Sequence, residues 1–171
     1  MFSKILKTLF YAKIHKNICI FIIKLLQKYK INLYIATPKK WCYMTKTKVH
    51  FEYSMHCQSE ILYEYLASAE GLAEWFADEV VERGDDFYFS WNGGSAEKAT
   101  LIRYKPESFV RFRWEEDEGT KYFFELTITV DEITNDLSLN ITDFCEKGDE
   151  NESRLYWDNL IENLQIKLGA A

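Results

Sequence analysis

The chain has 171 residues, of which 47% are hydrophobic and 16% aromatic, and this composition excludes a globally disordered protein. Its net charge of −6 conceals two regions of opposite sign, because residues 1–43 contain nine lysines and no acidic residue. The remainder has 12 basic against 27 acidic residues, a net charge of −15, which repels phosphate backbones and disfavours nucleic-acid binding.

Residues 1–44 form a basic, apolar leader that differs in kind from residues 45–171. Its longest strictly apolar run, at residues 18–23, is too short to span a bilayer. Three interpretations remain open: a translated upstream stretch with the true start at Met44, a basic amphipathic helix on an anionic membrane, and an imperfect signal anchor. Membrane contact is therefore expected only if this leader belongs to the expressed protein.

The acidic region begins with a strand and two short helices. The alternation in "TKVHFEYSM" (residues 47–55) predicts a half-buried strand. Apolar residues at helical spacing follow in two short segments, with Ser59 and Ser68 as the expected N-caps. The junction between these segments is so short that we expect a bent helix pair.

A long β region follows, punctuated by turn signals. Turns are expected at Gly84, at Asn92–Gly93 and after Lys105, where Pro106 suits the first central position. Residues 115–120 are expected to be a solvated polar turn, and another turn is expected near residue 135. The strand in "YFFELTITV" has Tyr122, Phe124, Leu126, Ile128 and Val130 on one face, and the next has Leu137, Leu139 and Ile141 on one face.

The chain ends in a long helix, whose apolar stripe comprises Trp157, Leu160, Ile161, Leu164 and Leu168. The order of elements predicts an α+β, helix-grip fold. In this fold a curved antiparallel sheet of about six or seven strands wraps on the long C-terminal helix, and the two short helices follow the first strand. Such a bent sheet is expected to leave room for a ligand between the sheet and the helix.

Three stretches accompany this order of elements: "EGLAEWFADEV" (70–80), "GDDFYFSW" (84–91) and "YKPESFVRFRWE" (104–115). Together, the order and these stretches resemble the START-like (SRPBCC, helix-grip) superfamily. The most similar branch comprises homologues of the heat-shock-protein-90 ATPase activator. Members bind lipids, sterols or polyketides, act as cyclases, or stimulate a chaperone, and many are bacterial. The resemblance implies a non-enzymatic domain that binds a small apolar ligand between sheet and helix. The alternatives are a protein-interaction adaptor or chaperone co-factor and, less favoured, a cyclase-type or hydrolase-type enzyme.

Aromatic side chains are the candidate cavity lining, with plain core packing as the alternative for each. They are Trp75, Phe76, Phe87, Phe89, Trp91, Trp114, Phe124 and Trp157.

No catalytic residue, metal site or cofactor is predicted. His50 and His56 lie on one face of the first strand but about 20 Å apart, too far to share an ion. Arg111 and Arg113 alternate with buried positions, and we expect them to point outward to surface acids. The cysteines form no C-x-x-C pair, which favours reduced thiols and a cytoplasmic location.

Overall fold

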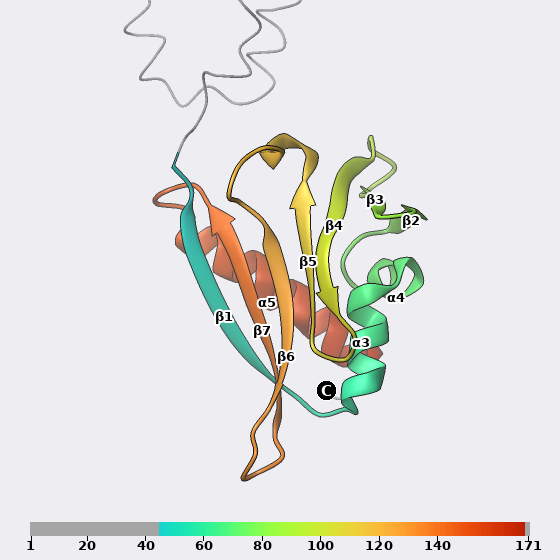
Figure 1. Ribbon diagram of the computed structural model, residues 1–171, viewed down its shortest axis with the longest axis vertical. Helices are drawn as coiled ribbons and strands as arrows, with labels where there is room; N and C mark the ends of the chain where they lie inside the picture. The colour runs from blue at the N-terminus through green and yellow to red at the C-terminus, as the bar shows by residue number, and fades with distance from the viewer. Residues whose placement is uncertain (1–44, 170–171) are drawn as a thin grey trace, which may run out of the picture. The chain divides into compact units, whose positions relative to one another are not determined.

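A computed structural model describes residues 45–169, which contain a seven-stranded antiparallel sheet, two short helices, a short 3-10 helix and a long C-terminal helix (Figure 1). The predictions made for residues 1–43 lie outside the described residues. No helix among residues 45–169 is long and apolar enough to cross a membrane. The predicted α+β, helix-grip class is confirmed.

The sheet is an antiparallel meander of the last six strands, and the first strand is added at one edge, next to the last strand. Its order is β1-β7-β6-β5-β4-β3-β2, so each strand from β2 to β7 pairs with the next, and β1 pairs with β7. The strands are β1 (Thr47–Met55), β2 (Glu79–Arg83), β3 (Asp86–Ser90), β4 (Glu97–Lys105), β5 (Phe109–Trp114), β6 (Phe124–Val130) and β7 (Leu137–Cys145). The seven strands match the upper end of the predicted number.

Helices α3 (Ser59–Ala67) and α4 (Ala69–Ala73) form the predicted bent pair. Ser68 caps α4 as predicted, because its hydroxyl accepts a hydrogen bond from the backbone N–H of Gly71 at 2.9 Å. The predicted capping role of Ser59 is wrong. Ser59 is already the first helical residue, and Gln58 occupies the N-cap position without a side-chain cap.

Residues with positive φ occupy the turns between strands, and a bulge in β4 bends the sheet. Gly84 has φ of +64° and connects β2 to β3, while Asn92 and Gly93 have φ of +52° and +65° within a longer β3–β4 loop. The register of β4 shifts between Leu101 and Arg103, where one extra residue forms a bulge. Such a bulge bends its strand and increases the local twist.

The polar turn after β5 differs from its prediction. Residues 115–117 form the short helix η1 (Glu115–Asp117), and Asp117 is only 7% exposed. The side chain of Lys46 reaches it from the start of β1, with Nζ 2.6 Å from Oδ2. The prediction of a wholly solvated turn is therefore wrong for Asp117, because a residue 71 positions away supplies its partner.

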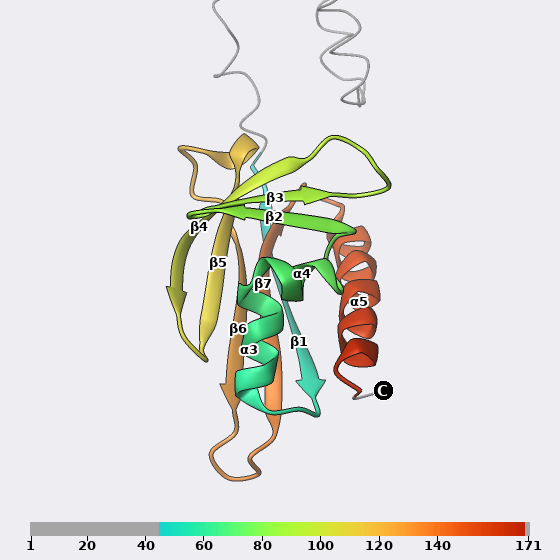
Figure 2. The same cartoon turned by 90° about the vertical axis from the view of Figure 1, so that its right-hand side faces the viewer.

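The C-terminal helix α5 (Glu150–Lys167) runs across one face of the sheet (Figures 1 and 2). Trp157, Ile161 and Leu164 of its predicted stripe are buried, and Leu160 and Leu168 are partly buried against the same core. The predicted inner faces of β6 and β7 are also buried, with one exception. Val130 is 50% exposed, since it ends β6 at the projecting β6–β7 hairpin (Figure 1).

Candidate functional site

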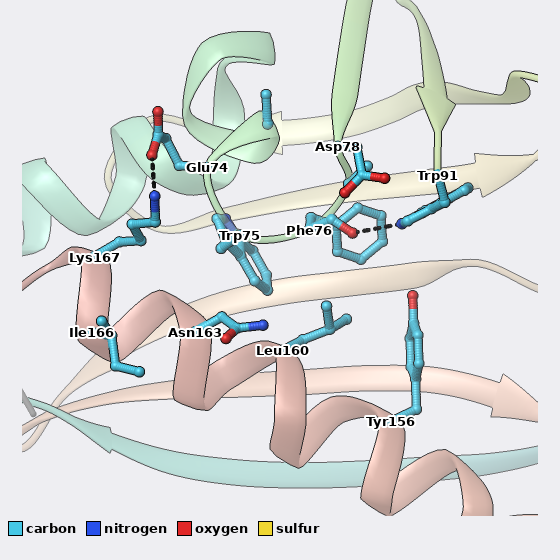
Figure 3. Close-up of a pocket in the computed structure, with 12 residues that line it drawn as sticks. Glu74, Trp75, Phe76, Asp78, Trp91, Tyr156, Leu160, Asn163, Ile166 and Lys167 are labelled. Atoms are coloured by element: carbon cyan, nitrogen blue, oxygen red, sulfur yellow. Dashed lines mark hydrogen bonds and ion pairs between the residues drawn. The ribbon is translucent and has the colours of Figure 1, made fainter. Parts of the chain in front are cut away.

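A groove of about 550 Å³ lies between residues 73–78, which join α4 to β2, and one side of α5 (Figure 3). The apolar side chains along it include Trp75, Phe76, Trp91, Tyr156, Leu160 and Ile166. The polar ones are Glu74, Asp78, Asn163 and Lys167. Three separate parts of the sequence therefore build this site.

Local backbone geometry fixes one wall of the groove. The carbonyl of Leu72 accepts hydrogen bonds from the backbone N–H groups of Phe76 and Ala77, at 2.8 and 3.3 Å, so the chain turns tightly after α4. The N–H of Asp78 then donates to the carbonyl of Ser90, which starts the pairing of β2 with β3. This turn directs Trp75 and Phe76 toward α5.

The opposite wall is a helical face. Tyr156, Leu160 and Asn163 follow one another at spacings of four and three residues, which aligns them on one side of α5. Figure 3 shows Tyr156 rising from the helix toward Trp91, with Leu160 next to it beneath Phe76.

The two tryptophans of the groove have no free N–H group. The indole Nε1 of Trp75 donates to the carbonyl of Tyr65, and that of Trp91 donates to the carbonyl of Phe76, both at 3.0 Å. Because its polar edge is bonded to the backbone, the partly accessible ring of Trp91 presents carbon atoms to the groove. The two rings are also held in fixed orientations by these bonds.

Behind the groove, the remaining candidate aromatic side chains pack together. The ring of Phe76 is central, with centroid distances of 5.2 Å to Phe89, 5.7 Å to Phe124 and 6.0 Å to Trp157. Of the eight candidates, Trp75, Phe76 and Trp91 border the groove, but Trp75 and Phe76 are only 4% and 2% exposed, whereas Trp91 is partly accessible. Phe87, Phe89, Phe124 and Trp157 are almost completely buried, and Trp114 is partly buried against them.

Tyr156 and Asn163 line the groove but were absent from the sequence-based candidates. Partial burial, followed by the charges of Asp143 and Glu97, raises the pKa of Tyr156 to about 12, although the side chain is 47% exposed. Like the hydroxyl of any tyrosine at neutral pH, its hydroxyl is protonated and can donate a hydrogen bond. The available signal was the helical spacing of both residues from Leu160.

Two of the three charged side chains along the groove form an ion pair with each other. Lys167 lies 2.8 Å from Glu74, so these two side chains form an ion pair that joins α5 to the end of α4. The carboxylate of Asp78 accepts a hydrogen bond from the backbone N–H of Asn92 at 2.5 Å. Asp78 is exposed and has no cationic partner among the described residues.

The arginines point outward, as predicted. Arg111 forms an ion pair with Glu125, with Nη2 2.6 Å from the carboxylate, and its guanidinium lies over the ring of Phe123. The Nε of Arg113 donates to the carbonyl of Tyr122 at 3.2 Å. Neither arginine lines the groove.

His50 in β1 and His56 just after it are both exposed. The Nδ1 of His50 lies 3.4 Å from the hydroxyl oxygen of Thr142. Across residues 45–169 there is no group of three or more His, Cys, Asp or Glu residues that could hold a metal ion.

Comparison with protein families gives one match: a model of the START-like superfamily domain fits residues 43–170. No curated protein matches the chain. Among solved structures, protein BfR322 from Bacteroides fragilis is 31% identical, with a TM-score of 0.54. The match covers 71% of this chain and 90% of BfR322.

Two more distant structures share the fold. The Aha1 dimer from Colwellia psychrerythraea has a TM-score of 0.60 at 16% identity, over 71% of this chain and 96% of that protein. DynU16, a protein from the dynemicin biosynthetic locus, has a TM-score of 0.56 at 15% identity. That match covers 71% of this chain but only 48% of DynU16.

Proposed function

The chain belongs to the START-like superfamily, and we propose that its folded domain is a non-enzymatic module that binds a small apolar ligand in the groove beside α5. The observation that carries the proposal is the partly accessible apolar surface formed by Trp91, Leu160 and Ile166, where the Trp91 N–H is bonded to the backbone. These side chains suit the apolar part of a ligand.

The size of the groove supports the same proposal. Its volume of about 550 Å³ lies within the range of roughly 300–1,000 Å³ typical of small-molecule sites. A ligand enters without separating the aromatic cluster behind Phe76, so binding does not cost core packing. The gain in free energy comes from covering apolar surface, at about 25 cal/mol per Å².

Titration of the full chain with the neutral fluorophore N-phenyl-1-naphthylamine tests the proposal. Two exposed apolar residues of α5 supply a matched pair of variants: Ile166 lines the groove and is 56% exposed, while Leu155 lies outside it and is 63% exposed. We expect Ile166→Asp to weaken binding by about fivefold or more and Leu155→Asp to leave it unchanged. Failure of the wild-type chain to bind the probe would refute the proposal, as would equal weakening by both variants.

A protein-interaction role is the second candidate, and the exposed apolar side chains on α5 favour it. Leu155 lies outside the groove, in a region of the chain whose net charge of −15 attracts basic partner surfaces. Leu155→Asp then separates the two functions, since it removes apolar contact area without altering the groove. Partner capture that is lost in this variant and at about 0.5 M salt would support the adaptor function.

A further inference from the structure

We propose that the groove selects a flat aromatic ligand that is neutral or positively charged and excludes anions, with Asp78 as the residue that favours the cation. This inference rests on the proposed function, because it names the chemical class of ligand for the same groove. It is carried by the combination of ring faces, unmatched negative charge and unused hydrogen-bonding groups in one site.

Flatness follows from the side chains that face the groove. Trp91, which is partly buried, and Tyr156, which is 47% exposed, approach it from opposite walls (Figure 3). Aromatic rings pair most favourably with other aromatic rings, in stacked or edge-to-face arrangements. A branched aliphatic chain would fill the same volume without these contacts.

The preference for a cation follows from the charges. Lys167 is neutralised by Glu74, which leaves the carboxylate of Asp78 as the uncompensated charge along the groove. Asp78 immediately follows the wall residues Trp75 to Ala77, and its carboxylate is bonded to the backbone N–H of Asn92, next to Trp91. A ligand ammonium group at this position would meet a carboxylate beside an indole face, the two partners that stabilise cations best.

Exclusion of anions has two sources. A carboxylate or phosphate in the groove would be repelled by Asp78 at short range and by the net charge of −15 in residues 44–171 at longer range. The cation of Lys167 does not offset this repulsion, since it is already paired. Fatty acids and nucleotides are therefore poor ligands for this groove.

Neutral polar groups on the ligand have partners on α5. The Tyr156 hydroxyl and the Asn163 amide line the groove, and neither makes a side-chain hydrogen bond within the described part of the chain. Tyr156 can donate to a ligand oxygen, and Asn163 can donate or accept. A hydroxyl or carbonyl substituent on an aromatic ligand would be satisfied there.

Three probes with the same ring system and different charges test the inference: 2-naphthylmethanol, 2-naphthylmethylammonium and 2-naphthoate. Their affinities for the full chain are measured by isothermal titration calorimetry at low ionic strength. We expect the ammonium to bind about fivefold more tightly than the alcohol, and the carboxylate about tenfold less tightly than the alcohol.

The variant Asp78→Asn tests whether the preference for the ammonium comes from Asp78 itself or from the overall negative charge of residues 44–171. Asparagine retains an oxygen for the N–H of Asn92, so we expect the variant to lose the preference for the ammonium and to bind it no more tightly than the alcohol. Asp85→Asn is the matched control, because it removes the same charge at the far end of the β2–β3 hairpin. That control should retain the preference.

The outcomes distinguish this inference from the proposed function. If the alcohol binds but the ammonium binds no better than the carboxylate, the charge selectivity is wrong and the apolar binding function stands. If Asp85→Asn reduces the ammonium preference as much as Asp78→Asn, the assignment to Asp78 is overturned. If none of the three probes binds, both the inference and the proposed function are refuted.

Discussion

The indole N–H of Trp157 donates a hydrogen bond to the carboxylate of Asp143, with 3.0 Å between Nε1 and Oδ2, and so connects α5 to β7. Asp143 continues the inward-facing series of Leu139 and Ile141 along β7, which turns its carboxylate toward the helix. Burial raises the pKa of Asp143, and the hydrogen bonds from the Phe144 backbone N–H and from Trp157 only partly oppose this effect.

The raised pKa predicts how Asp143 affects stability as the pH changes. The folded protein holds this proton more tightly than the unfolded chain, so the stabilisation is complete below the ordinary value of 3.8 and disappears as the pH rises through the folded-state pKa. Asp143→Asn stays neutral throughout. Its free energy of unfolding, relative to wild type, should therefore rise as the pH increases above about 4 in urea titrations.

Asp131 supplies a control of opposite sign. Backbone hydrogen bonds from Thr134 and Ile133 lower the pKa of Asp131, so its stabilisation is present at neutral pH and is lost in acid. Relative to wild type, Asp131→Asn should become less stable as the pH rises through the acid range. A pH-independent difference for Asp143→Asn would show that burial of its charge carries no cost.

The ion pair between Lys46 and Asp117 should contribute strongly to stability. The ammonium lies 2.8 and 2.6 Å from the two oxygens of a carboxylate that is almost completely buried. Lys46→Met leaves that carboxylate without its cation, and we expect the free energy of unfolding to fall by roughly 2 kcal/mol. Lys48→Met, on an exposed lysine of β1, should change it by less than about 0.5 kcal/mol.

A double-mutant cycle checks that the pair itself is responsible. Asp117→Asn should cost less in the Lys46→Met background than in the wild-type chain, because the unpaired charge has then been removed. Additive effects of the two substitutions would mean that the contact contributes nothing, despite its short distances.

The elements of the fold were predictable because each has a local periodic signal. Alternation marked the strands, a helical stripe from Trp157 to Leu168 marked α5, and Ser68 marked the start of α4. The burial of Asp117 was not predictable in this way, since its partner Lys46 is distant in sequence and the acidic run around it is typical of solvated turns.

The groove illustrates the same limit. Sequence identified aromatic residues as core or cavity lining, but the choice between these roles depends on how neighbouring rings fill space. Phe124 and Trp91 carry the same local pattern, yet one packs within the cluster and the other lines the groove. Tyr156 and Asn163 were missed because a single helix does not reveal which of its faces lies beside residues 73–78.

Gly71 is predicted to tolerate no side chain. A Cβ atom there would lie 2.5 Å from the carbonyl oxygen of Glu64 and 2.5 Å from the Cα of Tyr65, and backbone atoms cannot move aside without separating α3 from α4. We expect Gly71→Ala to lower the free energy of unfolding by about 3 kcal/mol, measured in urea. Ser68→Ala removes the cap of α4 and the hydrogen bond from the Ser68 hydroxyl to the Glu64 carbonyl, and should cost about 1 kcal/mol. Equal costs for the two variants would contradict a backbone clash.

We also predict that the folded domain does not require residues 1–43. The N-terminal edge of β1 is held by contacts that begin at Lys46, whose backbone N–H donates to the Tyr122 hydroxyl at 3.1 Å and whose side chain pairs with Asp117. A chain that begins at Met44 keeps both contacts and the apolar core, so its melting midpoint should lie within about 3 °C of the full chain. A chain that begins at Val49 loses both contacts and should melt clearly lower, which shows that the assay detects damage at this edge. A fall of more than about 10 °C on removing residues 1–43 alone would mean that they contribute to the core and that a domain boundary near residue 44 is wrong.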